Sequence, residues 1–150
     1  TSQVDKGDIR YDQYFSSGFT GFVRYSHRLM NNLEPPAIPG PSGGNSNGNV
    51  RVLNWQWAFG GTWTLDPTSL LEFRMGVSQT EGGKFPLFVG TPTIGTRFNI
   101  PNTPNDPRFT GGIPAQSVNG FSQFGVQGSN PQFQNPFVLN PKFNYAKVAG

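Results

Sequence analysis

The chain has 150 residues and a net charge of +3, and only 13% of its residues are charged, about half the share of roughly 25% that is usual in globular domains. Its 11 Lys and Arg residues form no run, which excludes a nucleic-acid footprint. The absence of cysteine excludes disulfides and thiolate metal sites.

The start of the chain, Thr1-Ser2-Gln3-Val4, lacks both the basic start and the apolar segment of a signal peptide. No apolar run reaches the roughly 18 residues of a transmembrane helix. We expect the chain to be a fragment of a longer protein.

Residues 6–28 are predicted to form a β-hairpin. Alternate residues of both halves are mostly apolar or aromatic, from Ile9 to Tyr25, and the residues between them are polar except for Phe22. This period of two is typical of strands with one apolar and one polar face. The turn residues Ser16-Ser17-Gly18 separate the two halves.

Residues 29–49 are rich in Pro, Gly and Asn and predict a long loop. Residues 50–80 then predict a second hairpin around the turn Asp66-Pro67-Thr68. The apolar face of this hairpin is unusually aromatic, and its members are Leu53, Trp55, Trp57, Phe59, Gly61, Trp63, Leu65, Leu71, Phe73, Met75 and Val77.

Residues 81–142 predict a second long loop, whose spaced aromatic residues suggest that it partly packs on itself, and residues 143–150 predict the start of a fifth strand. Short turns and long loops therefore alternate, as in outer-membrane barrels. We expect an all-β fold in which antiparallel amphipathic hairpins form about four to five strands of a transmembrane β-barrel with long Gly/Pro-rich loops.

The charged residues of the polar face are predicted to line the barrel lumen. They either contact a ligand or a plug, or pair across strands and stay hydrated, and the second interpretation is favoured. The candidates are Arg10, Arg24, Arg28, Glu72 and Arg74.

Aromatic residues with a polar edge are interpreted as membrane-interface residues in preference to a sugar-stacking platform. These are Tyr11, Tyr25, Trp55, Trp57 and Trp63.

The sequence indicates no catalytic or metal site. His27 is the single histidine, so a zinc site or a His-based triad would lack partners. Neither Gly43-Gly44 nor Gly82-Gly83 continues into a phosphate-binding motif. The carboxylates are scattered, which leaves a glycosidase pair open without indicating one. We expect no enzyme, no metal and no cofactor.

Three pieces of the chain carry a family resemblance. They are Asp8-Ile9-Arg10-Tyr11-Asp12 running to Phe22-Val23-Arg24-Tyr25-Ser26, then Leu65-Asp66-Pro67-Thr68-Ser69-Leu70-Leu71-Glu72-Phe73-Arg74-Met75-Gly76, and Pro131-Gln132-Phe133-Gln134-Asn135-Pro136-Phe137-Val138-Leu139-Asn140-Pro141-Lys142-Phe143-Asn144-Tyr145. The set resembles the barrel of TonB-dependent outer-membrane receptors, specifically the Oar-like group with an N-terminal carboxypeptidase-regulatory-like domain.

The resemblance implies a barrel of about twenty-two strands in the bacterial outer membrane, with a plug inside it. It implies import of a bulky, unidentified ligand, with energy from the TonB system reaching the protein through a plug region outside these 150 residues. Outer-membrane lipid would be the other partner.

Two alternatives stay open. In the first, the two hairpins pack face to face in a soluble or surface binding module. In the second, the isolated segment associates edge to edge into sheets or fibrils.

Overall fold

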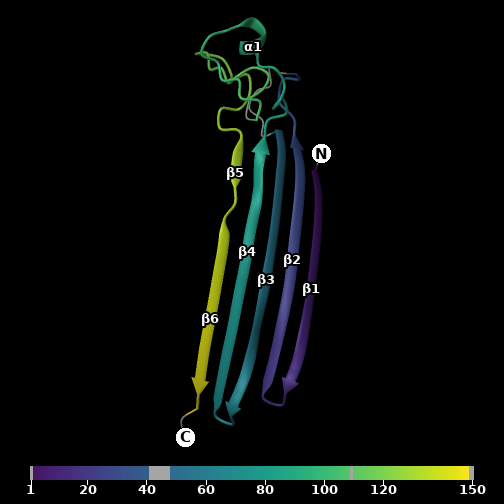
Figure 1. The fold of residues 1–150 in the computed structure, drawn as a ribbon, viewed down its shortest axis with the longest axis vertical. Helices are drawn as coiled ribbons and strands as arrows, with labels where there is room; N and C mark the ends of the chain where they lie inside the picture. Colours follow the sequence, from purple (N-terminus) through teal and green to yellow (C-terminus); the bar gives the residue numbers. More distant parts are fainter. Residues whose placement is uncertain (1, 41–47, 109, 149–150) are drawn as a thin grey trace. The chain divides into compact units, whose positions relative to one another are not determined.

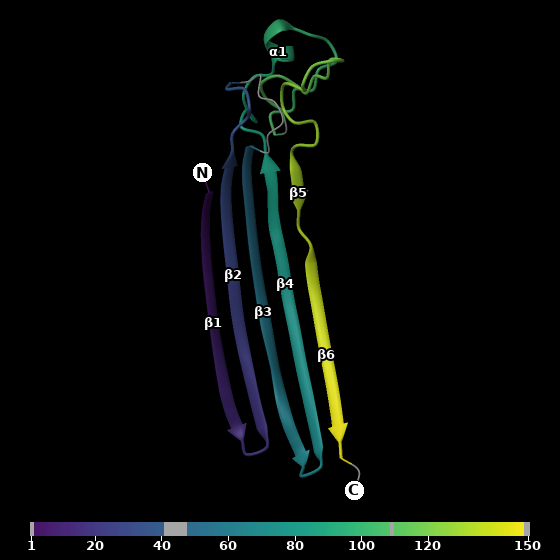
Figure 2. The same ribbon diagram turned by 180° about the vertical axis from the view of Figure 1, so that it is seen from behind.

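The computed structural model of the chain describes residues 2–40, 48–108 and 110–148. The order of elements is β1 (Ser2–Ser16), β2 (Phe19–Glu34), β3 (Gly48–Asp66), β4 (Ser69–Phe85), α1 (Ile94–Phe98), β5 (Gln132–Gln134) and β6 (Phe137–Lys147). The sheet has the strand order β1-β2-β3-β4-β5, and β6 also pairs with β4 (Figure 1). Figure 2 shows the same order from behind.

This arrangement confirms the all-β, antiparallel prediction and both hairpins. It also excludes the face-to-face sandwich, because β2 and β3 are neighbours in a single sheet. Among the described residues no helix is long and apolar enough to cross a membrane.

The strands are longer than the sequence predicted. Within the predicted loop 29–49, β2 continues as far as Glu34 and β3 already begins at Gly48. Residues 41–47, including Gly43-Gly44, lie outside the described part. At the other hairpin β4 continues to Phe85. The difference arises because backbone pairing needs no alternation of side chains, whereas the prediction ended each strand where the alternation faded.

The predicted loop 81–142 also ends too late, because β6 begins at Phe137 and passes through Pro141, which is opposite Met75. Proline has no backbone N–H to donate. It is therefore tolerated in an edge strand, which pairs with a neighbouring strand on one side only. Among the described strands β6 pairs with β4 alone. The predicted fifth strand 143–150 is the second half of β6; residues 149–150 lie outside the described part.

Hydrogen bonds hold the two short turns, one from within its own turn and the other from the neighbouring strand β3. The Asp66 carboxylate accepts from the backbone N–H of Thr68 at 2.8 Å and from its hydroxyl at 2.7 Å, which closes the turn between β3 and β4 on itself. The backbone N–H of Thr64 donates to the carbonyl of Gly18 at 2.8 Å. The turn predicted at Asp66-Pro67-Thr68 is therefore present.

The chain divides into two compact units. The loop unit comprises Thr1–Val4, Met30–Val52 and Gly82–Gln134, and the sheet unit comprises Asp5–Leu29, Leu53–Glu81 and Asn135–Gly150.

Backbone contacts organise the loop unit. Thr93 caps α1 and also bridges to Gly112, while Gln116 bridges to Phe124. Two of its aromatic residues, Phe85 and Phe133, meet edge to face with ring centroids 5.3 Å apart, whereas Phe98 and Phe121 are 65% and 77% exposed. The segment therefore packs on itself through backbone contacts and through this one ring pair.

The described residues of the sheet unit form a single layer. Val50 is the one buried hydrophobic residue in the described chain, and it belongs to the loop unit. The large apolar side chains of the sheet unit are therefore half-buried or exposed. A surface of this kind needs a cover from outside the chain.

Candidate functional site

The sheet unit presents two chemically different faces. We call the face of odd-numbered side chains the apolar face and that of even-numbered ones the polar face. The register between β4 and β6 extends this division to β6, because Phe73 is opposite Phe143 and Glu72 is opposite Asn144. One wall thus separates an aromatic surface from a charged one.

Two arginines of the polar face are held by carboxylates of β1. The Arg24 guanidinium lies 2.6 Å from Asp8, which also accepts a hydrogen bond of 2.6 Å from the Ser26 hydroxyl. Arg10 pairs with Asp12 on its own strand at 2.7 Å. The first pair links β1 to β2, while the second lies along one strand.

Glu72 connects β4 to β6 on the same face. Its carboxylate pairs with Arg74 and accepts a hydrogen bond of 2.9 Å from the Asn144 amide. Lys142 lies directly opposite Arg74 in the register. Glu72 therefore offsets two neighbouring positive charges.

The structure brings three of the predicted lumen residues together. Arg10, Glu72 and Arg74 border a hollow of about 230 Å³ on the polar face. Arg28 lies apart from them, beside a second hollow of about 370 Å³. Near Arg28 the Thr80 hydroxyl donates to the Asn54 side chain at 2.6 Å.

Phe22, the large apolar residue of the polar face, lies in a gap left by a glycine. A Cβ on Gly60 would lie 3.1 Å from the Phe22 ring, and the Arg10 guanidinium lies 4.8 Å from the ring centroid. The Phe22 ring therefore covers the bare backbone of Gly60 and also makes a cation–π contact with the Arg10 guanidinium.

Ring contacts join neighbouring strands on the apolar face. Tyr25 of β2 lies 4.6 Å from Trp57 of β3 between ring centroids, and Trp63 lies 6.3 Å from Phe19. Tyr11 donates from its hydroxyl to Gln13, and Trp55 is half-buried. The five predicted interface aromatics thus all belong to this face.

Aromatic rings also lie over glycines of the apolar face. The Phe15 ring covers Gly21, the Phe19 ring covers Gly61, and the His27 ring covers Gly7. This cross-strand arrangement supports glycine in a sheet, where it has no side chain to pack.

The sequence carries a signal for these pairs, because each glycine is on the apolar face, one strand away from a ring. His27 consequently has a packing role.

In the described part of the chain, no group of three His, Asp or Glu residues could hold a metal ion.

The loop unit contains one further ion pair. Asp106 receives the Arg108 guanidinium at 2.7 Å and the Arg108 backbone N–H at 2.9 Å. These two contacts lower the pKa of Asp106 from its usual 3.8 to about 2. The Asp106 carbonyl also accepts from the Thr110 backbone N–H at 2.8 Å, so this residue holds both sides of a tight turn.

A family model described as "outer membrane beta barrel domain" matches residues 1–150. The chain belongs to this family. No curated protein and no solved structure matches it significantly. Membership confirms the expected location, the bacterial outer membrane, and the expected contact with its lipid.

The strand lengths agree with an outer-membrane β-barrel domain. The first four strands have 15, 16, 19 and 17 residues, and a tilted strand needs roughly 9–11 to cross the hydrocarbon. On the apolar face of β4, the segment from Leu71 to Gln79 has this length before Glu81 introduces a charge. The strands therefore extend beyond the lipid.

The two faces can now be assigned by physical argument. Lipid cannot hydrate a charge, so the apolar face meets the membrane and the polar face meets the water-filled or plugged interior. The roles predicted for the individual lumen arginines and interface aromatics are consistent with this assignment and stay predictions.

Proposed function

We propose that this chain is part of the wall of a TonB-dependent outer-membrane transporter that binds and imports a bulky ligand. The observation that carries the proposal is the asymmetry of the connections. Both hairpins close in two-residue turns, at Ser17-Gly18 and Pro67-Thr68, whereas residues 86–131 separate β4 from β5. In bacterial barrels short turns face the periplasm and long connections face outward.

The outward connection is suited to ligand capture because it has internal structure. Helix α1, two isolated bridges and the Asp106 turn give it fixed surfaces. A cavity of about 210 Å³ lies among Thr93, Thr110 and Ala115. A structured loop of this length usually has a function of its own.

The polar face is suited to enclose a plug or a large solute. Its ion pairs are satisfied within the wall, through Asp8, Asp12 and Glu72, so the wall presents an ordered, hydrated surface. We also propose that the chain is not an enzyme, since Glu72 and Asp8 are engaged by arginines and His27 is packed over Gly7.

The test uses the intact protein purified from outer membranes, with the purified periplasmic domain of TonB as the probe. We expect the two to co-purify, and we expect little steady conductance in planar bilayers because a plug closes the lumen. A general porin prepared in the same way is the control. It should not co-purify with TonB, and it should show steady conductance. Absence of TonB binding, or an open channel, would overturn the proposal.

A second candidate concerns the 150 residues in isolation. In the described sheet β1 pairs only with β2 and β6 only with β4, so both outer edges have unused backbone groups. We propose that the isolated segment associates edge to edge. Negative-stain images of the purified segment would show sheets or fibrils, and discrete monomers would contradict this.

A further inference from the structure

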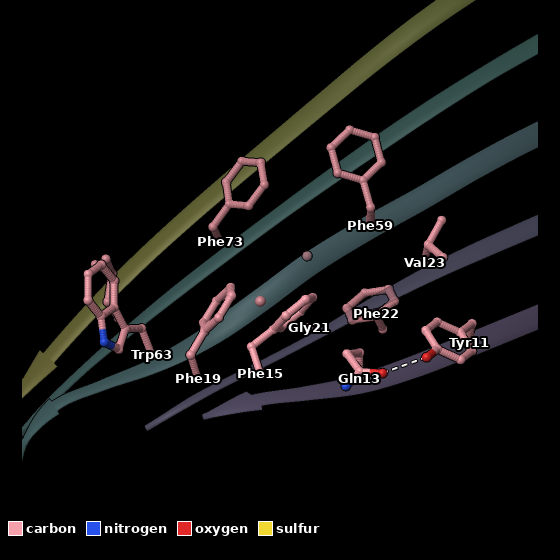
Figure 3. Close-up of a pocket in the computed structure, with 13 residues that line it drawn as sticks. Tyr11, Gln13, Phe15, Phe19, Gly21, Phe22, Val23, Phe59, Trp63 and Phe73 are labelled. Carbon is pink, nitrogen blue, oxygen red and sulfur yellow. Dashed lines mark hydrogen bonds between the residues drawn. The ribbon is translucent and has the colours of Figure 1, made fainter. Parts of the chain in front are cut away.

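The apolar face contains a hollow of about 390 Å³ (Figure 3). It lies between two pairs of rings, Phe15 with Phe19 and Phe59 with Phe73, whose centroids are 5.1 Å and 6.3 Å apart. Gly61 contributes bare backbone to the hollow. Its volume is within the roughly 300–1,000 Å³ of small-molecule sites.

We propose that this hollow seats one hydrocarbon chain of a phospholipid in a fixed position. The proposal rests on membership of the outer-membrane barrel family and does not depend on the transport function. Membership supplies the occupant, because lipid surrounds the outward face of such a barrel. The lining is almost wholly apolar, so an alkyl chain satisfies it without leaving a polar group unpaired.

Ring contacts between neighbouring strands separate this site from ordinary lipid contact. Rings on neighbouring strands contact one another on both sides of the hollow, and the Phe19 ring also contacts Trp63 at 6.3 Å. A void between such rings loses packing contacts unless a chain enters it. Lipid beside a convex surface has no such preference.

The position of the hollow indicates the periplasmic leaflet. Trp63 borders it and lies three residues before Asp66 at the short turn, and tryptophan favours the membrane interface. Since short turns face the periplasm, the hollow begins at that interface. The phospholipid headgroup would lie near Trp63 and its chain would run toward Phe59.

One polar side chain, Gln13, borders the hollow and can contact the glycerol esters of a lipid. The Gln13 side chain accepts from the Tyr11 hydroxyl and donates one N–H to the Tyr14 carbonyl at 3.0 Å. A primary amide has two N–H donors. The second can donate to an ester carbonyl and fix the lipid along its length.

The test compares two substitutions on one face of β4 in the intact protein, reconstituted in nanodiscs of phosphatidylethanolamine. Leu71→Trp adds a ring to the lining, whereas Val77→Trp makes the same change on the same face of β4 at a residue that does not line the hollow. Cryo-electron microscopy density over Gly61 and native mass spectrometry of retained phospholipid are the readouts.

We expect an ordered chain in the wild type and in Val77→Trp, and at least a fivefold loss of retained phospholipid in Leu71→Trp. Phe59→Ala removes one ring from the lining and should also lower the amount of retained phospholipid. It replaces Leu71→Trp in the test if that variant does not assemble. Equal retention in all variants would overturn the proposal. Density of a second protein copy in the hollow would overturn it too.

Discussion

The Phe19 ring of β2 lies directly over Gly61 of β3, so that a Cβ on Gly61 would come within 2.8 Å of the ring carbon Cε2. The Phe19 ring therefore occupies the space that a side chain at position 61 would fill, and it covers the exposed backbone of Gly61. Such pairs recur across the wall and give it definite positions where substitution should matter.

Replacing Gly61 by alanine should destabilise the barrel. The added methyl forces the Phe19 ring to move, and overpacking of this kind costs about 1–3 kcal/mol. Urea unfolding of the intact protein in detergent measures the loss.

Gly76→Ala is the matched control, because its Cβ would meet its nearest neighbour at 3.7 Å, an ordinary contact. If both variants lost the same stability, the Phe19–Gly61 pair would not be the cause.

An arginine on the apolar face should impair membrane assembly, whereas one on the polar face should not. Phe59 and Ala58 are neighbours on β3 that point to opposite faces. Phe59→Arg places a charge in lipid, at a cost of about 2–4 kcal/mol near the bilayer midplane, while Ala58→Arg places it in the hydrated interior. The fraction of folded protein in outer membranes, read from heat-modifiable migration, separates the two.

The contact between Glu72 and Asn144 should contribute modestly to the joining of β4 and β6. Both side chains lie on the polar face, and the bond is 2.9 Å long. Asn144→Ala should lower the thermal midpoint by about 2 °C. Asn140→Ala, on the same face of the same strand and opposite Gly76, is the control. An unchanged midpoint in Asn144→Ala would show that water replaces the bond fully.

The turn at Asp106 should loosen in acid. Its pKa is about 2 when folded and 3.8 when unfolded, so the stabilisation is complete above about pH 5 and is lost as the pH falls toward 2. Pepsin, which is active over this range, should cut near residues 104–110 faster at pH 2 than at pH 4. In Asp106→Asn the part of this difference that comes from the Asp106 carboxylate should disappear. If the ratio of cleavage rates at pH 2 and pH 4 were identical in this variant and in the wild type, Asp106 would not be the cause of the loosening.

Much of the wall could be predicted from the sequence, because the membrane imposes a period of two that is visible in single strands. Residues from Leu53 to Leu65 show it plainly. The strand ends could not be predicted in the same way. Beyond the lipid both faces meet water, so residues such as Asn31 and Asn32 carry no alternation although the backbone pairing continues.

The site was predictable only in part, because its contacts depend on register. Arg24 could be placed on the polar face, but its partner Asp8, which also accepts from Ser26, follows only once β1 and β2 are aligned. The hollow beside Gly61 was not predictable, since it arises from residues of four strands. Counting glycines on the apolar face would have pointed to it.

The pairing of β4 with β6 runs without a break from Ser69 opposite Lys147 to Gln79 opposite Phe137. A short turn would fix such a register by its length, but here residues 86–136 intervene, so the alignment comes from the side chains themselves. A shift of one residue would turn Lys142 and Asn144 toward lipid and Phe143 inward. The length of the intervening segment therefore does not set the register, so residues could be added to it or removed from it without changing which side chains of β6 lie on the apolar face.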